Sequence, residues 1–233
     1  MKGRTILVTS GNGQIELYIA DLSSQRQVRK LAKDVQERHD RMHVLINNAG
    51  VYMPQRRLTE DCIEMTLAVN FLAPFLLTGL LQDLQKRSAP SRIINISSVA
   101  HMSARVDWTS LQGERGYDGY SAYALSKLAL IHFTYRLAER LRGRGVTVNC
   151  LHPGVINTKL LRAGFGPGGA SVEEGARTPV YLASSPDVEN VNGKYFQDRR
   201  IAQSSPLTRD EDLQERFWRL GEKLTGLSWE PGA

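Results

Sequence analysis

Short apolar segments rich in β-branched residues alternate along this chain with longer segments whose apolar residues recur at helical spacing. The first kind predicts strands, and the second predicts helices with one buried face. The expected strands cover residues 5–9, 15–20, 43–46, 92–96, 146–151 and 193–197. This alternation predicts a single α/β domain in which helices cover both faces of a doubly wound parallel sheet.

The expected helices have recognisable starts and breaks. They cover residues 24–39, about 59–86, 121–141, and the segments that begin at the capping boxes Ser171–Glu174 and Thr208–Glu211. Ser23 or Ser24 can cap the first of these helices. Near Pro74 the second is expected to kink or to restart, because proline cannot continue a helical hydrogen-bond ladder.

Polar residues follow four of the expected strands at the point where each strand ends. Asp21, Asn47–Gly50, Ser97-Ser98 and His152–Gly154 occupy these positions. The carboxyl ends of parallel strands lie at one edge of a sheet, and ligands of open α/β sheets bind there. The sequence therefore predicts a ligand site at this edge, formed by segments that are far apart in the chain.

Tyr123 and Lys127 are four residues apart near the start of the helix expected over residues 121–141. Residues at this spacing share one helix face. A free phenol has a pKa of about 10, and a neighbouring ammonium group lowers it, so that such a pair can exchange a proton near neutral pH. By itself, however, the pair is more simply explained by a packed tyrosine and a surface lysine.

Other residues, which occur in a fixed order along the chain, favour a catalytic role for Tyr123 and Lys127 over simple packing. The ordered set consists of Asn47–Gly50, Asn70, Ser98, Tyr123, Lys127 and Pro153-Gly154. Together these residues resemble the short-chain dehydrogenase/reductase (SDR) family, and the resemblance extends from Asp21 to the C-terminus. It implies a Rossmann-like fold and an NAD(P)-dependent oxidoreductase that transfers hydride between the nicotinamide and a carbonyl or alcohol substrate.

The resemblance also implies catalytic roles. Tyr123 is expected to act as general acid and base, and Lys127 to hold the nicotinamide ribose and lower the pKa of Tyr123. Ser98 is expected to hydrogen-bond the substrate oxygen, and Asn70 to anchor a water molecule of the proton relay. Asn70 is alternatively a buried polar residue at the helix kink near Pro74.

A set of cofactor contacts follows from the same resemblance. These residues are Asp21, Leu22, Asn47, Ala49, Gly50, Tyr123, Lys127, Pro153, Gly154 and Thr158. Asp21 would touch the adenine, although it is equally well placed as a simple helix cap. Pro153, Gly154 and Thr158 would hold the nicotinamide carboxamide. The resemblance alone favours NADP over NAD, and no metal is expected.

Two segments resemble the retinol-dehydrogenase-like branch of this family. One is the long connection Asp107–Gly119, and the other is Tyr195–Asp198. Members of that branch often act on lipophilic alcohols and aldehydes, but a fold does not fix a substrate. The loop Gly164–Gly169 is either a lid over the substrate or an ordinary surface loop.

The N-terminal segment departs from the family pattern. A glycine-rich turn that opens a helix should follow the first strand and hold the cofactor pyrophosphate. Instead, Gly11-Asn12-Gly13 leads directly into what resembles the family's third strand, so that about 40 residues are missing relative to ordinary element lengths. The missing part includes the strand end that distinguishes NAD from NADP, and the N-terminal βαβ unit is expected to be incomplete.

Two explanations of this gap lead to different structures. Parallel strands need a crossover of about a dozen residues, which Ser10–Gln14 cannot provide. An interruption of the chain between Ser10 and Gly11 would explain the coherent set of later motifs, and we prefer this hypothesis. If the chain is truly continuous, Asn12-Gly13 predicts an antiparallel hairpin between the first two strands.

Composition and charge argue against several other classes of function. The net charge is +6, but the basic residues are scattered and form no nucleic-acid-binding motif, so no nucleic-acid partner is expected. Cys62 and Cys150 show no metal or redox spacing and are expected as buried, reduced thiols of a cytoplasmic protein. The apolar stretch Leu67–Leu81 contains Asn70 and Pro74, which predicts a buried helix and no membrane span.

The two most apolar helical segments, Leu67–Leu81 and Ser121–Leu141, carry more apolar residues than one buried face requires. Because such helices pair across subunits in the resembled family, a homodimer or homotetramer is expected, unless both are buried within the monomer. The other expected partner is a small carbonyl or alcohol substrate. The alternative function is that of a non-catalytic or truncated SDR-like protein that binds no cofactor, which the N-terminal gap favours and the retained catalytic set opposes.

Overall fold

The fold is built on one five-stranded sheet with the order β3-β4-β5-β6-β7. The computed structural model describes residues 4–7 and 15–229, with residues 4–7 limited to their backbone pairing. The strands are β3 (Val44–Asn47), β4 (Ser91–Ile96), β5 (Val146–His152), β6 (Tyr195–Gln197) and β7 (Arg200–Ile201). Strands β3 to β6 run parallel, and β7 pairs antiparallel with β6. The predicted α/β fold with a parallel sheet is therefore confirmed.

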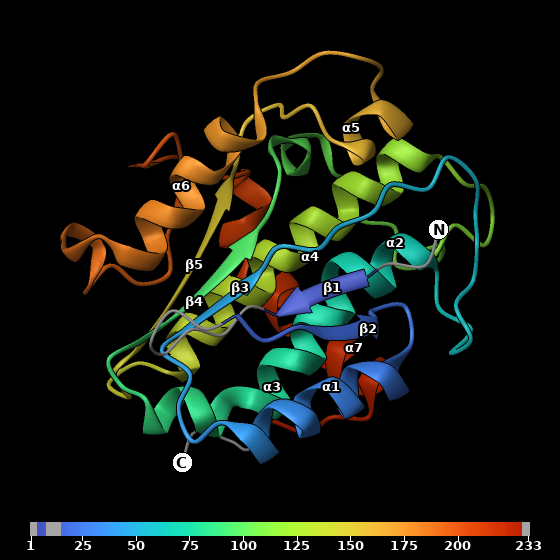
Figure 1. Ribbon diagram of the computed structural model, residues 1–233. Helices are drawn as coiled ribbons and strands as arrows, with labels where there is room; N and C mark the ends of the chain where they lie inside the picture. The colour runs from blue at the N-terminus through green and yellow to red at the C-terminus, as the bar shows by residue number, and fades with distance from the viewer. Residues whose placement is uncertain (1–3, 8–14, 230–233) are drawn as a thin grey trace.

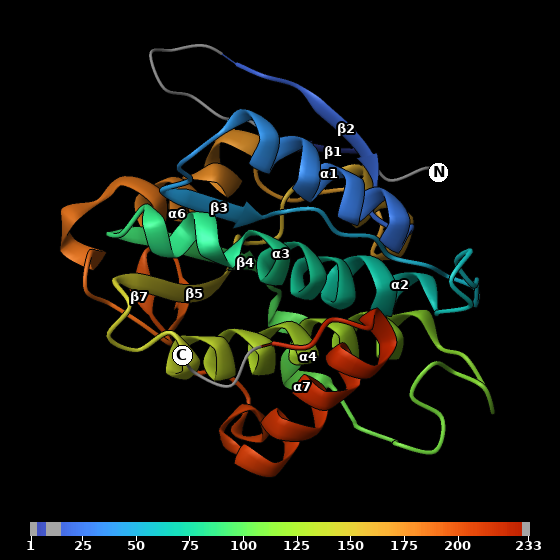
Figure 2. The ribbon, with the colours of Figure 1, turned by 90° about the horizontal axis from the view of Figure 1, so that it is seen from below.

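Helices cover both faces of this sheet, as predicted. They are α1 (Gln25–Arg38), α2 (Met65–Leu67), α3 (Ala73–Arg87), α4 (Gly119–Arg140), α5 (Lys159–Gly164), α6 (Val172–Ser184) and α7 (Glu211–Thr225), with short 3-10 helices at Val99–Ser103, Pro186–Val188 and Pro206–Arg209. Helix α6 packs on one face against β4, and α3 and α4 pack on the other face (Figure 1). Helix α1 packs beside α3, and α7 packs against α4 (Figure 2).

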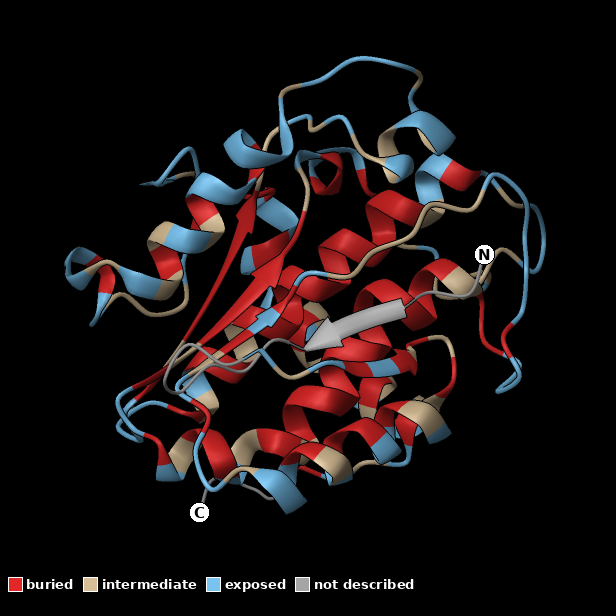
Figure 3. Cartoon of the chain, in the orientation of Figure 1, coloured by how far each residue is buried: buried red, intermediate tan, exposed pale blue. Residues whose placement is uncertain are grey.

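Strands β4 and β5 form the most deeply buried part of the sheet, which Figure 3 shows in red. Their isoleucine, valine and leucine residues suit strands that are covered on both faces. Because β3, β4 and β5 point the same way, the segments that follow them gather at one edge, beside the start of α4 (Figure 1). The polar motifs that end these strands are therefore brought to the same side of the molecule.

The long helix predicted from about residue 59 begins later, at Met65. The Glu64 carboxylate accepts hydrogen bonds from the amides of Thr66 and Leu67, at 2.8 and 2.7 Å. Such an acceptor satisfies amides that the start of a helix leaves without partners. The difference arises because a glutamate performs the capping, and this residue type is not among the usual N-caps.

The kink expected near Pro74 takes the form of a π-helical turn at Ala68–Leu72, between α2 and α3. In this turn the Ala73 amide donates to the Ala68 carbonyl. Pro74 has no amide hydrogen with which to continue an ordinary α-helical ladder, so the hydrogen-bond pattern changes just ahead of it. Asn70 lies within the irregular turn.

The predicted helix caps have different outcomes. Ser24 caps α1, and at α6 the side chains of Ser171 and Glu174 each accept from the other's amide, so that this capping box is confirmed. The cap predicted at Thr208 is wrong, because the Asp210 carboxylate caps α7 and a 3-10 helix precedes it. Asp210 is the better acceptor for a helix start, since its negative charge also interacts favourably with the helix dipole.

The apolar surfaces of α3 and α4 are covered within this chain. Trp218 of α7 and Trp229 pack against Phe75 of α3 and Phe133 of α4, with ring centroids 5.3 to 6.0 Å apart. The burial of both helices in the monomer, which the sequence left open, therefore accounts for their apolar composition. The expected homo-oligomer stays a prediction.

One helical stretch in the described part of the chain, Met65–Arg87, is long and apolar enough to suit a membrane span. In this fold, 83% of its most apolar 18-residue window is buried. Its neighbours are α1 and α4, which agrees with the buried helix predicted for Leu67–Leu81. The lack of a membrane span stays a prediction.

Strands β1 (Arg4–Leu7) and β2 (Tyr18–Asp21) pair antiparallel in a separate two-stranded sheet. This pairing is the one expected of a continuous chain that turns at Asn12-Gly13. The turn and the Ser10–Gly11 link lie outside the described residues, so an interruption there stays a prediction. Strand β3 is consequently the edge of the main sheet, and β2 packs on α1 (Figure 2).

The two cysteines differ in exposure. Cys150 of β5 is buried, as expected, and burial raises the pKa of its thiol. Cys62 is exposed, which corrects the expectation of a buried thiol. Because the helix begins only at Met65, Cys62 lies in the preceding turn with a left-handed φ of 58°, where its amide donates to the Thr59 carbonyl.

Replacing Gly221 with alanine should destabilise the fold, because a β-carbon at this position of α7 would lie 2.7 Å from the fully buried Phe75 ring. Overpacking costs up to about 3 kcal/mol, which exceeds the gain of about 1 kcal/mol in helix propensity. Urea denaturation should show a lower midpoint with an unchanged slope. In a Phe75→Leu background, Gly221→Ala should lower the free energy of unfolding by less. An equal loss in both backgrounds would show that the Phe75 ring is not the cause.

Candidate active site

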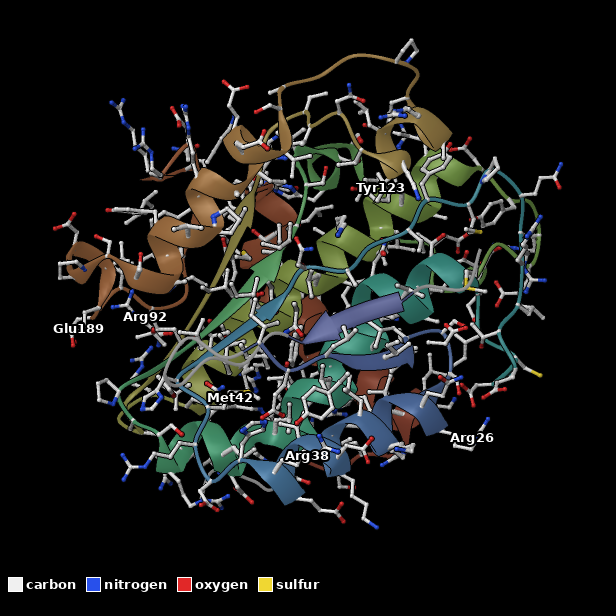
Figure 4. All side chains as sticks on the ribbon, in the orientation of Figure 1. Arg26, Arg38, Met42, Arg92, Tyr123 and Glu189 are labelled. Carbon is white, nitrogen blue, oxygen red and sulfur yellow. The ribbon has the colours of Figure 1, made fainter. Side chains whose placement is uncertain are left out.

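A cavity of about 790 Å³ opens at the carboxyl edge of the sheet. The predicted site residues that line it are Leu22, Ala49, Gly50, Ser98, Tyr123, Lys127, Pro153, Gly154 and Thr158. They come from the segments that follow β2, β3, β4 and β5, from α4 and from the cap of α5. Figure 4 labels Tyr123 at this edge, near α5. The structure therefore brings most of the predicted set together around one space.

Tyr123 lies in the second turn of α4, with its ring buried beside the cavity. Burial raises the pKa of its phenol, and hydrogen bonding with the Ser98 side chain acts in the opposite direction. Ser98 is placed there as the cap of the 3-10 helix Val99–Ser103, where its hydroxyl accepts from the Ala100 amide at 3.2 Å. The two hydroxyl groups therefore border the same cavity, as the sequence predicted.

The Lys127 ammonium is buried near Tyr123 and donates to the Ile96 carbonyl at the end of β4, at 2.8 Å. Its nitrogen lies 5.7 Å from the centroid of the Tyr123 ring, and burial lowers the pKa of Lys127 to about 8. The expected lowering of the Tyr123 pKa by this group is not found. Burial is the largest influence on the Tyr123 pKa and raises it, and the Lys127 ammonium donates its hydrogen bond to the strand-end carbonyl.

Asn70 lies behind the cavity wall rather than on its surface. Its Oδ1 atom accepts from the Val51 amide at 2.8 Å, and its Nδ2 atom donates to the Val51 carbonyl and to the Ser126 hydroxyl, both at 3.0 Å. Both amide hydrogens are therefore in use. The main-chain carbonyl of Asn70 receives no ordinary α-helical hydrogen bond. The residue four positions later is Pro74, which has no amide hydrogen to donate. The side chain holds the loop after β3 against α4.

Asn47 was predicted to contact the cofactor, but it points away from the cavity. Its Nδ2 atom donates to the Thr78 hydroxyl at 3.1 Å and to the Asn95 side chain at 2.7 Å. The next residue, Asn48, lines the cavity instead. Side chains alternate in direction along a strand, so the last residue of β3 faces the helices and the following one faces the ligand space.

Asp21 does not line the cavity either. Its carboxylate accepts from the amide and the hydroxyl of Ser23, at 3.0 and 2.7 Å. These are the contacts of the simple turn-and-cap role that the sequence left open. Leu22, the next residue, does line the cavity, so this end of β2 still reaches the site.

An aromatic cluster that sequence patterns do not reveal surrounds the Tyr123 ring. The ring centroids of Tyr52 and Phe165 lie 6.1 and 5.8 Å from it, and Tyr120 lies 5.9 Å from Phe165. The spacing of Tyr120, three residues before Tyr123 on one helix face, could have identified it. Tyr52 and Phe165 come from distant loops, and nothing local in the sequence connects them with the site.

The glycine-rich loop over residues 157–169 contains α5, and its Leu160 and Phe165 line the cavity. A β-carbon on Gly164 would lie 2.8 Å from the Tyr52 ring, so this glycine lets α5 pack directly on the aromatic cluster. The segment Gly164–Gly169 therefore borders the cavity through Phe165, which favours a lid over an ordinary surface loop. Its movement stays a prediction.

His152, at the end of β5, also lines the cavity. Its Nδ1 atom is buried and has no hydrogen-bond partner within residues 15–229. Burial lowers the pKa of His152 to about 4, so that the ring is neutral near neutral pH. A buried polar atom of this kind usually binds water or a ligand. His152, at the strand end that the sequence identified, therefore offers the cavity a polar nitrogen atom that can bind a ligand.

The cavity fits the nicotinamide half of the expected cofactor. Gly50 allows a ligand to approach closely, since a β-carbon there would come within 3.4 Å of the Lys127 nitrogen. Lys127 has three ammonium hydrogens and uses one on a strand-end carbonyl, and His152 offers its unpartnered nitrogen. The pyrophosphate half fits less well. The described residues after Gly13 lead into β2, and not into a helix whose N-terminus could hold a phosphate.

Comparison with known proteins agrees with this site. The family model for short chain dehydrogenase matches residues 4–165. Retinol dehydrogenase 13 of Mus musculus is 40% identical over 238 residues, which cover 95% of this chain and 71% of that protein. Retinol dehydrogenase 12 of Homo sapiens is 39% identical over 234 residues, which cover 97% of this chain and 74% of that protein.

Solved structures show the same fold. An uncharacterized protein from Mycobacterium Paratuberculosis superposes with a TM-score of 0.77 at 28% identity, covering 93% of this chain and 78% of that one. The Pseudomonas aeruginosa RhlG/NADP active-site complex superposes with a TM-score of 0.60 at 29% identity, covering 76% of this chain and 72% of that one. The predicted Rossmann-like fold is therefore confirmed.

The buried Lys127 ammonium should make the stability of the fold depend on pH. In the folded chain the group is neutral above about pH 8, whereas in the unfolded chain it stays charged up to about pH 10.4, so the unfolded state binds more protons between these values. The free energy of unfolding should therefore rise with pH across this window, by up to about 3 kcal/mol relative to Lys127→Met. Urea titrations of both proteins measure this difference, and parallel pH profiles would contradict it.

Proposed function

The chain belongs to the short-chain dehydrogenase family and is an oxidoreductase of alcohol and carbonyl groups with NAD(P) as its cofactor, and we propose that Tyr123 moves the proton in this reaction. The observation that carries the proposal is that Tyr123, Ser98 and Lys127 border one cavity. Oxidation of an alcohol or reduction of a carbonyl needs a proton carrier and a hydrogen-bond donor at the reacting oxygen. These three side chains supply both, beside the pocket that suits the nicotinamide.

Bound NAD(P) supplies or accepts the hydride. During reduction, Tyr123 gives its phenolic proton to the substrate oxygen, and during oxidation it takes a proton from the alcohol. The Ser98 hydroxyl donates a hydrogen bond to the same oxygen, where negative charge develops. Tyr123 is buried among aromatic side chains, which limits the access of bulk water to the reacting oxygen.

Lys127 holds the ribose next to the nicotinamide through the ammonium hydrogens that the Ile96 carbonyl leaves free. With a ligand over the cavity, water is excluded and the interaction of a charged Lys127 with a phenolate on Tyr123 becomes stronger. The pKa lowering expected of this pair is therefore proposed for the loaded site. Asn70 contributes by fixing the Val51 backbone. Its main-chain carbonyl, to which Pro74 has no amide hydrogen to donate, is the proposed acceptor for a relay water.

A lipophilic alcohol or aldehyde is the proposed substrate class. Val99, Val155, Leu160 and Phe165 contribute apolar surface to the cavity, and burial of such surface favours binding of an apolar chain. Two similar proteins are named retinol dehydrogenases, which points to the same class of substrate. All-trans-retinol and its aldehyde are therefore the first probes.

A second candidate function is that of a non-catalytic SDR-like protein that binds no cofactor. The observation that favours it is the antiparallel pair β1–β2, which stands where a glycine-rich turn and a helix would hold the pyrophosphate. The arrangement of Ser98, Tyr123 and Lys127 argues against it, since a binding protein needs no proton carrier. Cofactor binding separates the two functions.

NADPH and NADH should bind with similar affinity. The strand end that distinguishes them in the family has no counterpart in this sequence, and Asp21 is engaged with Ser23. Fluorescence titration should give dissociation constants within about tenfold of each other, or about 1.4 kcal/mol, and Lys127→Ala should weaken both. A hundredfold preference for either would contradict this prediction, and no binding of either would support the non-catalytic function.

Tyr123→Phe should abolish turnover of all-trans-retinaldehyde with NADPH while leaving the fold and the cofactor affinity intact, because it removes only the proton-carrying hydroxyl. Loss of general acid–base catalysis typically costs about 10²–10⁴-fold in rate. Steady-state kinetics measure the loss, with circular dichroism as the control for folding. Lys127→Ala should lose turnover and cofactor affinity together. Undiminished turnover by Tyr123→Phe would refute the assigned role.

A further inference from the structure

We propose that His101 is a positioning residue of the active site, which fixes the Ser98 main chain so that the Ser98 hydroxyl stays beside Tyr123. The inference rests on the proposed function, because it assigns a supporting residue to the same site. His101 belongs to the 3-10 helix Val99–Ser103 that Ser98 caps. Its side chain is 0% exposed and does not line the cavity.

Both ring nitrogens of His101 have backbone partners. The Nδ1 atom lies 2.6 Å from the Ser98 carbonyl oxygen, and the Nε2 atom lies 3.0 Å from the Ser205 amide nitrogen. A carbonyl only accepts and an amide only donates, so Nδ1 carries the ring proton and Nε2 is the acceptor. The imidazole is therefore held as one tautomer that bridges the Ser98 turn to a segment 104 residues further along the chain.

The surroundings of His101 suit this neutral form. Burial lowers its pKa, with the Ser98 carbonyl acting in the opposite direction. The Tyr195 ring of β6 lies 5.0 Å away between centroids, and the neighbouring His152 is itself neutral because burial lowers its pKa to about 4. The two hydrogen bonds of the ring therefore persist without a competing charge beside them.

The far end of the bridge is anchored to the helix that carries Tyr123. The Ser205 carbonyl accepts from the Thr208 hydroxyl at 2.6 Å. That hydroxyl lies 2.7 Å from the Ser204 hydroxyl, which lies 2.8 Å from the phenolic oxygen of Tyr135 on α4. Through His101, the main chain of Ser98 is thus connected to α4 by a continuous series of hydrogen bonds.

Ser98 needs such support because its own turn is short. Within the 3-10 helix its carbonyl accepts from the His101 amide at 3.2 Å, which is longer than the 2.6 Å contact with the imidazole. Hydrogen bonds of 3-10 helices have poorer geometry than those of α-helices. The side chain of His101, rather than the turn alone, therefore sets where the Ser98 backbone lies.

Two amide substitutions separate the two hydrogen bonds. In His101→Asn, the side-chain amide reaches the position of Nδ1 and can donate to the Ser98 carbonyl. In His101→Gln, the amide oxygen reaches the position of Nε2 and can accept from the Ser205 amide. Both variants are uncharged and lose the same aromatic ring, so each is the matched control of the other.

With NADPH and all-trans-retinaldehyde, His101→Gln should lower kcat by about tenfold or more, because small displacements of catalytic groups are costly. KM for the aldehyde and the dissociation constant of NADPH should stay near their wild-type values. His101→Asn should recover most of kcat. Equal kcat values for the two variants, or a loss confined to His101→Asn, would overturn the proposal, since a purely structural role would not distinguish them.

Hydrogen exchange tests the proposal without turnover. The Ala100 amide donates to the Ser98 hydroxyl, so its exchange reports whether Ser98 is held. Exchange there should accelerate in His101→Gln and not in His101→Asn, and equal acceleration would overturn the proposal. If His101→Gln does not fold, ¹⁵N NMR of the wild-type imidazole decides, because a protonated Nε2 would exclude the bridge. If the wild-type protein shows no turnover but the exchange or NMR result is as expected, the proposed function is contradicted and the role of His101 is not.

Discussion

The site depends on a reciprocal pair of contacts between α4 and the end of β4. The Lys127 ammonium donates to the Ile96 carbonyl, and the Ser97 hydroxyl donates to the Lys127 carbonyl. An ammonium group withdrawn from water is costly unless it is hydrogen-bonded, so its strand-end partner restricts where this helix can lie along the sheet. The placement of Tyr123 follows, because it is one turn earlier on the same helix face and close to Ser98.

Beneath the cavity, side-chain amides and hydroxyls join the strands to the helices. The Asn47 amide donates to Thr78 of α3 and to Asn95 of β4, and the Asn95 amide donates to Thr134 of α4. A buried polar network whose members are satisfied favours one arrangement of the elements that contribute to it. Asn47, which the motif suggested as a cofactor contact, therefore joins β3 to α3 and β4 beneath the cavity, and Asn70 holds the backbone of the loop after β3.

Local rules were sufficient for much of this protein. Strand and helix periodicity predicted the sheet, and the ordered motifs predicted that Ser98, Tyr123 and Lys127 would meet at its carboxyl edge. The errors concern properties that arise only when distant segments meet. Phe165 and Tyr52 surround the Tyr123 ring from loops that have no common pattern, and burial, which is a tertiary property, raises the phenol pKa that a helical pair alone would lower.

The π-helical turn ahead of Pro74 sets the rotational phase of the segment that contains it. Such a turn amounts to one additional residue in a regular helix, and one residue corresponds to about 100° of rotation. Asn70, within the turn, reaches Val51, whereas Thr78, two turns later, reaches Asn47 under the sheet. With one residue fewer, one of these side chains would face away from its partner. The irregular turn thus rotates the two parts of this helical segment relative to each other. Its first part can therefore contact the loop after β3, while a later part contacts the end of strand β3.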